Sequence, residues 1–482
     1  MPQKDTVRPP CHPATRGRAL VWPLLLVALW GGCAKQTPPD ILIILVDTLR
    51  ADRVGATVNG QELTPFLSSL AAQGFLFRNA YAQSSWTNPS VATLLTSRYQ
   101  SQHGLTSFQA VMAEDEVTLP EVLQQHGYAT GGFVANFLVR RNLGFAQGFD
   151  QYQTYSRKLE TGDPDDRRLI KARAEQINSE ALSWLDRINN ERPQAPVFMY
   201  LHYMEPHNPY DPADQYLDRV LGGRPRPDAE EINRRMELPS WGTFSDEQVQ
   251  AVKDLYDAEV MSLDAALRSL FKELASRHFL DDCIVVVVAD HGEEFREHGL
   301  MGHHQTLYEE VVRVPLIMRV PGHTGPERVD SVVSVSEIAP TVLDFAGIPA
   351  PATFEAGSLR EVMGLRSRWW PFGSSSNGTL ASGVAFSELI KDGTVRQRPH
   401  ERAVISATDK LIVNVDGANE FYDLRADPGE TNPNALGGDA RARLSGGIAD
   451  FKTEMAGSGA PSATHAMDAD TRERMRALGY QE

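Results

Sequence analysis

Two strongly apolar runs end in acidic residues, although they lie far apart in the chain. Residues 41–46 (ILIILV) lead into Asp47, and residues 284–289 (IVVVVA) lead into Asp290 and His291. Both runs are short, continuous and rich in β-branched residues, as expected for strands buried on both faces of a parallel sheet. Ligands bind to such sheets at the carboxyl ends of the strands, so the two acids and the imidazole can converge there. The pattern predicts a metal site; the simpler alternative is that Asp47 caps a helix and Asp290-His291 opens a turn.

Helix-like and strand-like patterns alternate along the rest of the main part of the chain. Helices are predicted at residues 64–73, 90–96, 167–190 and 246–275, and extended segments at 75–82, 128–135 and 196–202. Pro89 suits the first turn of a helix, and Asn88 is expected to cap it. Strand, helix and strand in alternation predict an α/β fold with a doubly wound, mostly parallel sheet flanked by helices.

The C-terminal part of the sequence differs from the main part in composition and pattern. Residues 365–382 are rich in glycine and serine and predict a surface connection, and two extended runs follow at 402–407 and 410–415. We therefore expect a main α/β domain over residues 40–364 and a smaller C-terminal α+β subdomain over residues 383–482.

Composition and charge restrict the class of protein. The 482 residues, 41% of them hydrophobic, can bury the core of one large α/β domain with an appendage, or of several smaller domains. The chain carries 47 basic and 63 acidic residues, a net charge of −16, and no run of Lys or Arg forms a basic patch. These features exclude a nucleic acid as the main partner.

The N-terminal segment has the pattern of an export signal. Basic residues precede an apolar stretch at residues 19–30, which is short for a membrane span and ends in Gly31-Gly32-Cys33. We expect a signal peptide at residues 1–33 of the lipoprotein type, with Cys33 acylated; the alternative is an uncleaved membrane anchor. In either case the rest of the chain faces the periplasm or the cell surface, and a lipoprotein of the cell envelope would touch the membrane only through its lipid. Only Cys283 then remains, which excludes a disulfide framework and fits a buried small hydrophobic residue.

A series of short motifs runs through residues 40–430. They are VDTLRAD at 46–52, PSVATLLT at 89–96, LHYMEPH at 201–207, DHGE at 290–293, YEE at 308–310 with RVPLI at 313–317, IAPT at 338–341, and YDL at 422–424 with DP at 427–428. In kind and order these motifs resemble the sulfatase family, within the wider alkaline-phosphatase-like superfamily. The resemblance implies an α/β hydrolase of sulfuric or phosphoric esters that binds a divalent metal ion.

The position of the nucleophile departs from the family's usual pattern. The family has a cysteine or serine two residues before the proline of this motif, and that residue is oxidised to formylglycine. Here the position is Thr87, which cannot become formylglycine because its β-carbon carries a methyl group, and Val91 replaces an arginine of the motif. Other branches of the superfamily use threonine directly, so the resemblance implies a subgroup in which a metal-activated Thr87 attacks.

The alternative is that Thr87 is an ordinary helix-entry residue. The rival hydroxyls are Ser84, Ser85 and Ser90, and only the register to Pro89 selects Thr87.

By the same resemblance, the metal ligands are Asp47, Asp290 and His291, with Thr87 completing the set. Thr48 stands where the family often has a second aspartate. Because a site that mixes carboxylates with an imidazole suits transition metals, we expect Mn or Zn rather than Ca. A second metal ion is compatible with a further group of residues, namely Glu205, His207, His298, His303 and His304.

Histidines provide the other predicted catalytic groups. His207 matches the family's active-site histidine, which contacts the anionic group or protonates the leaving oxygen. His303 and His304 lie near the place of a family lysine that binds sulfate, so either suits an anion ligand or a general acid. His298 and His103 are weaker candidates. A Lys-Trp-His motif of the family has no match, and the corresponding region is residues 133–138.

These features predict an exported, metal-dependent hydrolase of sulfate or phosphate/phosphonate esters, with phosphate favoured by Thr87. The expected substrate is a small-molecule, glycan or lipid ester. One alternative is a transferase that moves a phospho-group onto an envelope lipid or glycan. Another is a non-catalytic protein that binds glycans or lipids, which the departures at positions 87 and 91 favour and the retained acids and His291 oppose.

Overall fold

The computed structural model describes residues 38–158, 169–236, 244–365, 383–390, 400–414, 418–434, 436–455, 463–466, 471–472 and 475. The predicted signal peptide at 1–33 lies outside these residues, as does nearly all of the predicted surface connection at 365–382. Residues 38–482 cluster as one unit. In the part of the chain that is described, no helix has the length and apolar character needed to cross a membrane.

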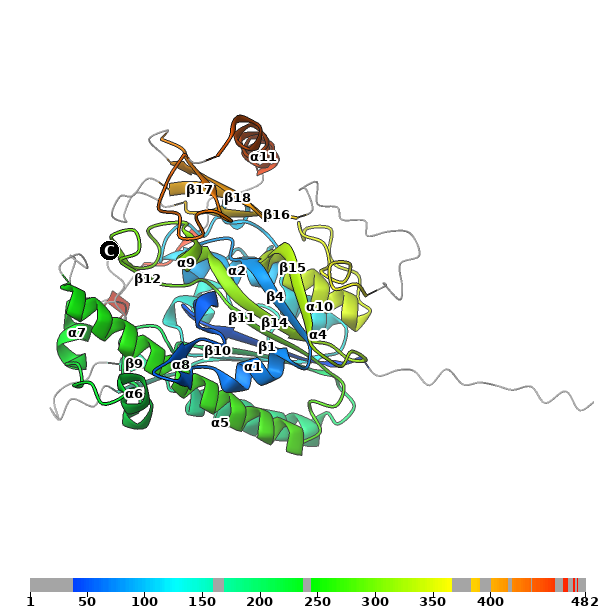
Figure 1. Ribbon diagram of the computed structural model, residues 1–482. Helices are drawn as coiled ribbons and strands as arrows, with labels where there is room; N and C mark the ends of the chain where they lie inside the picture. Colours follow the sequence, from blue (N-terminus) through cyan, green and yellow to red (C-terminus); the bar gives the residue numbers. More distant parts are fainter. Residues whose placement is uncertain are drawn as a thin grey trace, which may run out of the picture. The chain divides into compact units, whose positions relative to one another are not determined.

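An eight-stranded sheet forms the centre of the fold, in the order β15-β4-β14-β11-β1-β10-β6-β7 (Figure 1). Strand β14 runs antiparallel to both of its neighbours, and the other neighbouring pairs are parallel. The strands are β1 (Asp40–Val46), β4 (Phe75–Tyr81), β6 (Ala129–Val134), β7 (Gln151–Thr154), β10 (Val197–Tyr203), β11 (Cys283–Ala289), β14 (Arg313–Arg319) and β15 (Glu327–Ser334). The predicted α/β class with a mostly parallel sheet is confirmed.

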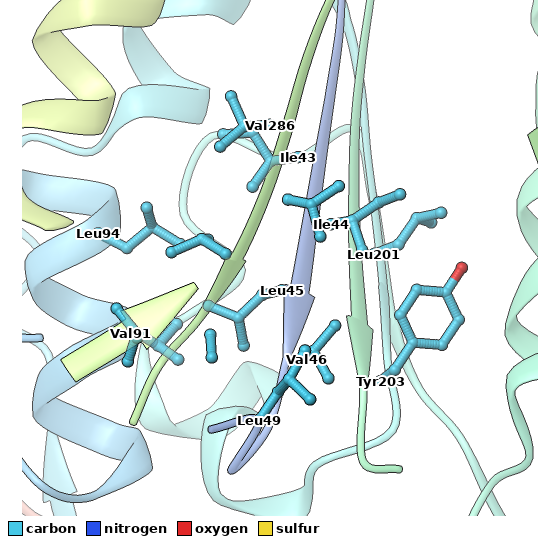
Figure 2. Packing of buried hydrophobic residues seen from close by; sticks show 14 of the residues in the cluster. Ile43, Ile44, Leu45, Val46, Leu49, Val91, Leu94, Leu201, Tyr203 and Val286 are labelled. Carbon is cyan, nitrogen blue, oxygen red and sulfur yellow. The ribbon is translucent and has the colours of Figure 1, made fainter. Parts of the chain in front are cut away.

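The two apolar runs are adjacent strands in the middle of this sheet. β1 pairs with β11 on one side and β10 on the other, and Val46 is level with both Ala289 and Tyr203. Every residue of 41–46 is fully buried. In Figure 2, Val91 and Leu94 of a neighbouring helix lie on one side of β1, and Leu201 and Tyr203 of β10 lie on the other. Because the three strands end level, the residues that follow them meet at one edge of the sheet.

Helices cover both faces of the sheet. Helices α1, α5 and α8 lie on one face, and α2, α4 and α10 on the other (Figure 1). The helices are α1 (Pro65–Ala71), α2 (Thr87–Thr96), α3 (Gln100–His103), α4 (Leu119–Gln125), α5 (Ala174–Glu191), α6 (Asp214–Leu221), α7 (Ala229–Met236), α8 (Asp246–Ser276), α9 (Glu309–Val312), α10 (Ile338–Ala346) and α11 (Gly438–Met455). The α8 helix begins where Ser245 accepts a hydrogen bond from the Gln248 backbone, a capping box that fixes its start.

Two predicted helix starts are wrong. α2 begins at Thr87, with the extended residue Trp86 before it, so Asn88 lies inside the helix and does not cap it. The earlier start is allowed because a proline in the first turn lacks only an N–H that would have no partner inside the helix. α5 begins at Ala174 rather than near residue 167, because Leu169–Lys171 forms a strand (β9) that pairs with Ser156–Lys158 (β8).

A small antiparallel sheet follows the main one in sequence. It consists of β16 (Val384–Glu388), β17 (His400–Ser406), β18 (Asp409–Asn414) and β19 (Glu420–Asp423), and α11 packs on β17 and β18. The stacked rings of Phe386 and Phe451, with centroids 4.6 Å apart, are part of its core. The Glu388 N–H donates to the Gln83 carbonyl oxygen at 2.8 Å, which ties this sheet to the chain just before α2. The domain limits 40–364 and 383–482 stay predictions.

Candidate metal and active site

The ends of β1 and β11 bring Asp47, Asp290 and His291 together. All three side chains are fully buried. One ligand atom from each lies within 4.8 Å of the others. His291 Nε2 is 3.4 Å from Asp290 Oδ2 and 3.9 Å from Asp47 Oδ1. The level ends of adjacent parallel strands therefore place the three predicted ligands in one group.

Neighbouring hydrogen bonds orient the ligand atoms of this group. Asp290 Oδ1 accepts the N–H groups of Thr48, at 3.2 Å, and of His291, at 2.9 Å. His291 Nδ1 lies 2.9 Å from the Gly292 carbonyl oxygen, so this nitrogen carries the proton and Nε2 presents its lone pair. Among the described residues, Asp47 Oδ1 and Asp290 Oδ2 have no hydrogen-bond partner. Two carboxylate oxygens and an imidazole nitrogen are the donors that a divalent transition metal accepts, so these residues fit the ion that we expect.

The protonation equilibria of the two acids are shifted in opposite directions. Burial opposes ionisation of Asp47, but a hydrogen bond from His202 and the nearby imidazoles of His207 and His291 together lower its pKa. Burial raises the pKa of Asp290, and the negative charge of Asp47 raises it further. Burial also lowers the pKa of His291, which favours the neutral ring that binds metals. Two close carboxylates that cannot both be charged become compatible when a divalent cation lies between them.

Thr87 lies beside this group as the first residue of α2. Its side chain is fully buried, and its Oγ1 is 3.4 Å from His291 Nε2 and 3.5 Å from Asn136 Nδ2. The N-terminal end of α2 adds a favourable potential for negative charge at the same place. The geometry allows Thr87 Oγ1 to act on an anionic group bound next to the ligand atoms.

Thr48 has an unusual backbone conformation between Asp47 and Leu49. Its φ angle is 58°, in the left-handed region that β-branched residues seldom adopt. Two hydrogen bonds hold it there: its N–H donates to Asp290 Oδ1, and its carbonyl accepts the Tyr256 hydroxyl at 2.7 Å. This conformation turns the Thr48 N–H toward the ligand group.

Of the predicted catalytic histidines, His303 is the most central. Its ring centroid lies 4.4 Å from that of His291, 5.1 Å from that of His207 and 5.2 Å from that of His304. Its Nδ1 is 3.1 Å from Glu293 Oε1, and His207 Nδ1 is held by the Asn208 carbonyl. His207 and His303 therefore border the ligand group.

Of the five residues considered for a second ion, His207, His303 and His304 lie together, whereas His298 and Glu205 have partners of their own. His298 Nδ1 is bound to Glu310 at 2.7 Å and its Nε2 is 3.2 Å from the Glu430 carbonyl oxygen, while Glu205 accepts the Ala174 N–H. Burial lowers the pKa of His298, but the Glu310 carboxylate outweighs this and raises it to about 9. A metal ion at His298, Glu294 and Glu310, which lie close enough together to hold one, would have to displace the proton on His298. His103, the other weak candidate, packs near Thr93 of α2.

Two residues next to Asp47 were not predicted from the sequence. Asn136 Nδ2 donates to Asp47 Oδ2 at 2.5 Å, and His202 Nε2 is 3.3 Å from the same oxygen. His202 is on β10 and Asn136 follows β6, so both lie near the ends of parallel strands that neighbour β1. The strand-end rule applied to these two strands would have selected them.

The molecule is thus an α/β protein with a group of candidate metal ligands at the carboxyl ends of its central strands. Residues 39–348 match the sequence profile of the sulfatase family. The chain belongs to the sulfatase family and is an ester hydrolase of that family.

The chain is also similar to several individual proteins. N-acetylglucosamine-6-O-sulfatase of Bacteroides thetaiotaomicron is 24% identical over 498 residues, which covers 86% of this chain and 86% of that protein. Arylsulfatase of Clostridium perfringens is also 24% identical and covers 81% of this chain and 89% of its own length. The structure of the protein BT4656 in complex with its substrate D-glucosamine-2-N,6-O-disulfate has a TM-score of 0.67 at 21% identity, covering 87% of this chain and 98% of that one. Phosphonate monoester hydrolase of Agrobacterium radiobacter has a TM-score of 0.66 at 20% identity, covering 86% and 95%.

Proposed function

We propose that this protein is a metal-dependent ester hydrolase in which Thr87 is the nucleophile. The observation that carries the proposal is the position of Thr87 Oγ1, 3.4 Å from His291 Nε2 and beside the ligand group. The substrates are sulfate, phosphate or phosphonate esters. Phosphate and phosphonate esters are favoured because threonine cannot supply the formylglycine on which the family's sulfate chemistry depends.

The proposed metal ligands are Asp47, Asp290 and His291, with the hydroxyl of Thr87. A divalent ion held there lowers the pKa of the hydroxyl and neutralises charge on the transferred group. The mixed oxygen and nitrogen ligands favour Mn or Zn over Ca.

The proposed reaction has two halves, transfer of the group to Thr87 and hydrolysis of the resulting ester, and the residues around the metal ligands are assigned to them as follows. Thr87 Oγ1 gives up its proton to water and forms a bond to phosphorus or sulfur while the bond to the alcohol oxygen breaks, and that oxygen leaves with the electron pair. His207 or His303 supplies its proton, and His304 helps to hold the anion. Nδ1 of His207 is held by the Asn208 carbonyl and Nδ1 of His303 by Glu293, so the proton would come from Nε2 of a ring that is protonated on both nitrogens. Water then attacks the Thr87 ester, releases the acid and restores the hydroxyl.

The proposed location is the cell envelope, on the periplasmic or outer side. The signal pattern at residues 1–33 supports it, with acylation of Cys33 as the proposed means of attachment. A relative from Drosophila melanogaster named as an extracellular sulfatase homolog is 25% identical over 80% of this chain and 37% of its own length. The sulfated sugar bound by the protein BT4656 favours a glycan ester, and the likeness to phosphonate monoester hydrolases favours a small phosphoester.

The test compares hydrolysis of an aryl phosphate, an aryl phosphonate monoester and an aryl sulfate by the purified protein loaded with Mn, Zn or Ca. We expect turnover of the phosphorus esters with Mn or Zn. Thr87→Ala should lower kcat at least about a thousandfold, because it removes the attacking oxygen, whereas Thr87→Ser should keep most of the activity. Release of the aryl alcohol is measured together with the metal content of each variant.

The matched control is Thr93→Ala, which removes a hydroxyl from the same helix beside His103. It should leave kcat unchanged. Full activity of Thr87→Ala would contradict the assigned nucleophile. A wild-type protein that binds metal but hydrolyses none of the three esters would favour the non-catalytic alternative, and a product that forms only with an added alcohol would favour the transferase.

A further inference from the structure

Asn136 is a fully buried amide whose orientation is fixed by its own backbone. It precedes the short 3₁₀ helix Phe137–Val139, and its Oδ1 accepts the Leu138 N–H at 2.7 Å. A backbone N–H can only donate, so the oxygen of the amide must face it. The NH₂ group of Asn136 is therefore turned away from the helix and toward the metal ligands.

The NH₂ group of Asn136 donates hydrogen bonds to two residues of the site. Nδ2 lies 2.5 Å from Asp47 Oδ2 and 3.5 Å from Thr87 Oγ1. These partners belong to different elements, since Asp47 follows β1 and Thr87 begins α2. The contact to Asp47 leaves Oδ1 as the carboxylate oxygen that faces His291.

The donor on Asn136 also determines where the hydroxyl proton of Thr87 can point. Because Nδ2 donates to Oγ1, the Thr87 hydroxyl must direct its own hydrogen away from Asn136, and in the metal-free protein His291 Nε2, 3.4 Å away, can accept it. Donation to an oxygen that is gaining negative charge is stronger than donation to a neutral hydroxyl. A donor at this place therefore stabilises the attacking oxygen more than the resting one.

We propose that Asn136 aims Thr87 Oγ1 for attack and stabilises the charge that develops on it, while its contact to Asp47 keeps that ligand in place. This inference rests on the proposed function, in which Thr87 is the nucleophile. It assigns to Asn136 a role that a purely structural buried amide would not have.

The test uses Asn136→Asp, which keeps the shape of the side chain and an oxygen for the Leu138 N–H but removes the N–H donors. Asn136→Ala is the second variant. The rate of aryl alcohol release is measured under single-turnover conditions in metal-loaded protein, with the Michaelis constant and metal content determined in parallel. We expect the rate to fall about 10- to 100-fold, with the Michaelis constant and metal content within about twofold of wild type.

Asn178→Ala is the matched control. Asn178 is also a buried amide, which accepts the Tyr203 hydroxyl at 2.6 Å and donates to the Ala266 carbonyl at 3.0 Å, between α5 and α8. Its loss should lower the melting temperature without changing the single-turnover rate. If it changed the rate as much as Asn136→Ala does, the effect would be one of stability and the inference would be wrong.

Two further outcomes separate this inference from the function on which it rests. If Thr87→Ala is inactive and both Asn136 variants react within about twofold of wild type, the inference fails and the proposed function stands. If both Asn136 variants lose activity because they have lost the metal, and excess metal restores that activity, then Asn136 acts only by holding Asp47 in place. That result also overturns the proposed action of Asn136 on Thr87. If Thr87→Ala stays active, the proposed function and this inference fail together.

Discussion

At the scale of single residues, the site combines groups that are unfavourable to bury. Asp47 and Asp290 are both fully buried and close together, and each leaves one oxygen without a hydrogen-bond partner in the described part of the chain. Such an arrangement costs free energy in the absence of a cation. Stability and metal binding should therefore oppose each other at these two residues.

Asp290→Asn is predicted to stabilise the metal-free protein and to abolish metal binding. Burial and the charge of Asp47 raise the folded-state pKa of Asp290 above its ordinary value of 3.8. The stability that the protonated form contributes is complete below that value and is lost as the pH rises toward the folded-state pKa. The melting temperature of the chelator-treated wild type should therefore fall from pH 4 upward more steeply than that of the variant. Thermal unfolding at several pH values, with and without Mn, measures both effects.

The metal provides the control for this prediction. At a concentration about 100 times the dissociation constant, a bound ion stabilises the wild type by about 2.7 kcal/mol. Asp290→Asn should show no such gain. If the melting temperatures of the metal-free wild type and of metal-free Asp290→Asn changed equally with pH, Asp290 would already be ionised in the folded state.

At the scale of secondary structure, the sequence predicted the elements that carry a strong pattern. The strands before Asp47 and Asp290 were predicted because unbroken β-branched runs are typical of central parallel strands. The start of α2 was misplaced because a proline in the first turn is compatible with several starting points. The Asn136 and His202 contacts were missed because no local pattern shows that β10 and β6 lie next to β1 in the order β11-β1-β10-β6, and the strand-end rule selects these two residues only when it is applied to those strands as well.

Gly292 belongs to the loop that carries Asp290 and His291, here called the ligand loop, and it lies directly against α9. A Cβ at this position would lie 2.1 Å from the carbonyl oxygen of Glu310, which is backbone and cannot move aside without shifting α9. Gly292→Ala should therefore lower the free energy of unfolding by about 1–3 kcal/mol or more, and weaken metal binding by moving His291. Urea unfolding and metal titration measure the two effects.

Gly446→Ala is the matched control for that substitution. Gly446 lies in α11, and a Cβ there would meet nothing within 4 Å. Because alanine favours a helix over glycine, this variant should gain about 0.5–1 kcal/mol of stability and bind metal normally. A Gly292→Ala protein that binds metal like the wild type would mean that the loop can relax.

At the scale of the whole molecule, the small sheet is connected to the ligand loop through buried charges. Lys410 of β18 is fully buried, and its Nζ lies 2.9 Å from Glu430 Oε1 and 3.1 Å from Glu309 Oε1. Glu309 begins α9, whose residue Val311 accepts the Gly292 N–H at 2.7 Å. The C-terminal sheet thus supports α9, and α9 supports the loop that carries His291.

Lys410→Met is predicted to destabilise the protein and to weaken metal binding at a distance. Burial raises the pKa of Glu430 to about 7 even though Lys410 opposes the shift, so loss of the lysine leaves two facing carboxylates without a cation. Removal of one partner of a buried ion pair costs about 3–5 kcal/mol. The double variant Lys410→Met/Glu430→Gln removes one of those carboxylates and should recover much of the loss. Urea unfolding of the wild type, both single variants, Lys410→Met and Glu430→Gln, and the double variant measures the coupling, and metal titration shows whether α9 transmits it. Metal affinity that stays at the wild-type value while stability falls would mean that the ligand loop holds its shape without the C-terminal sheet.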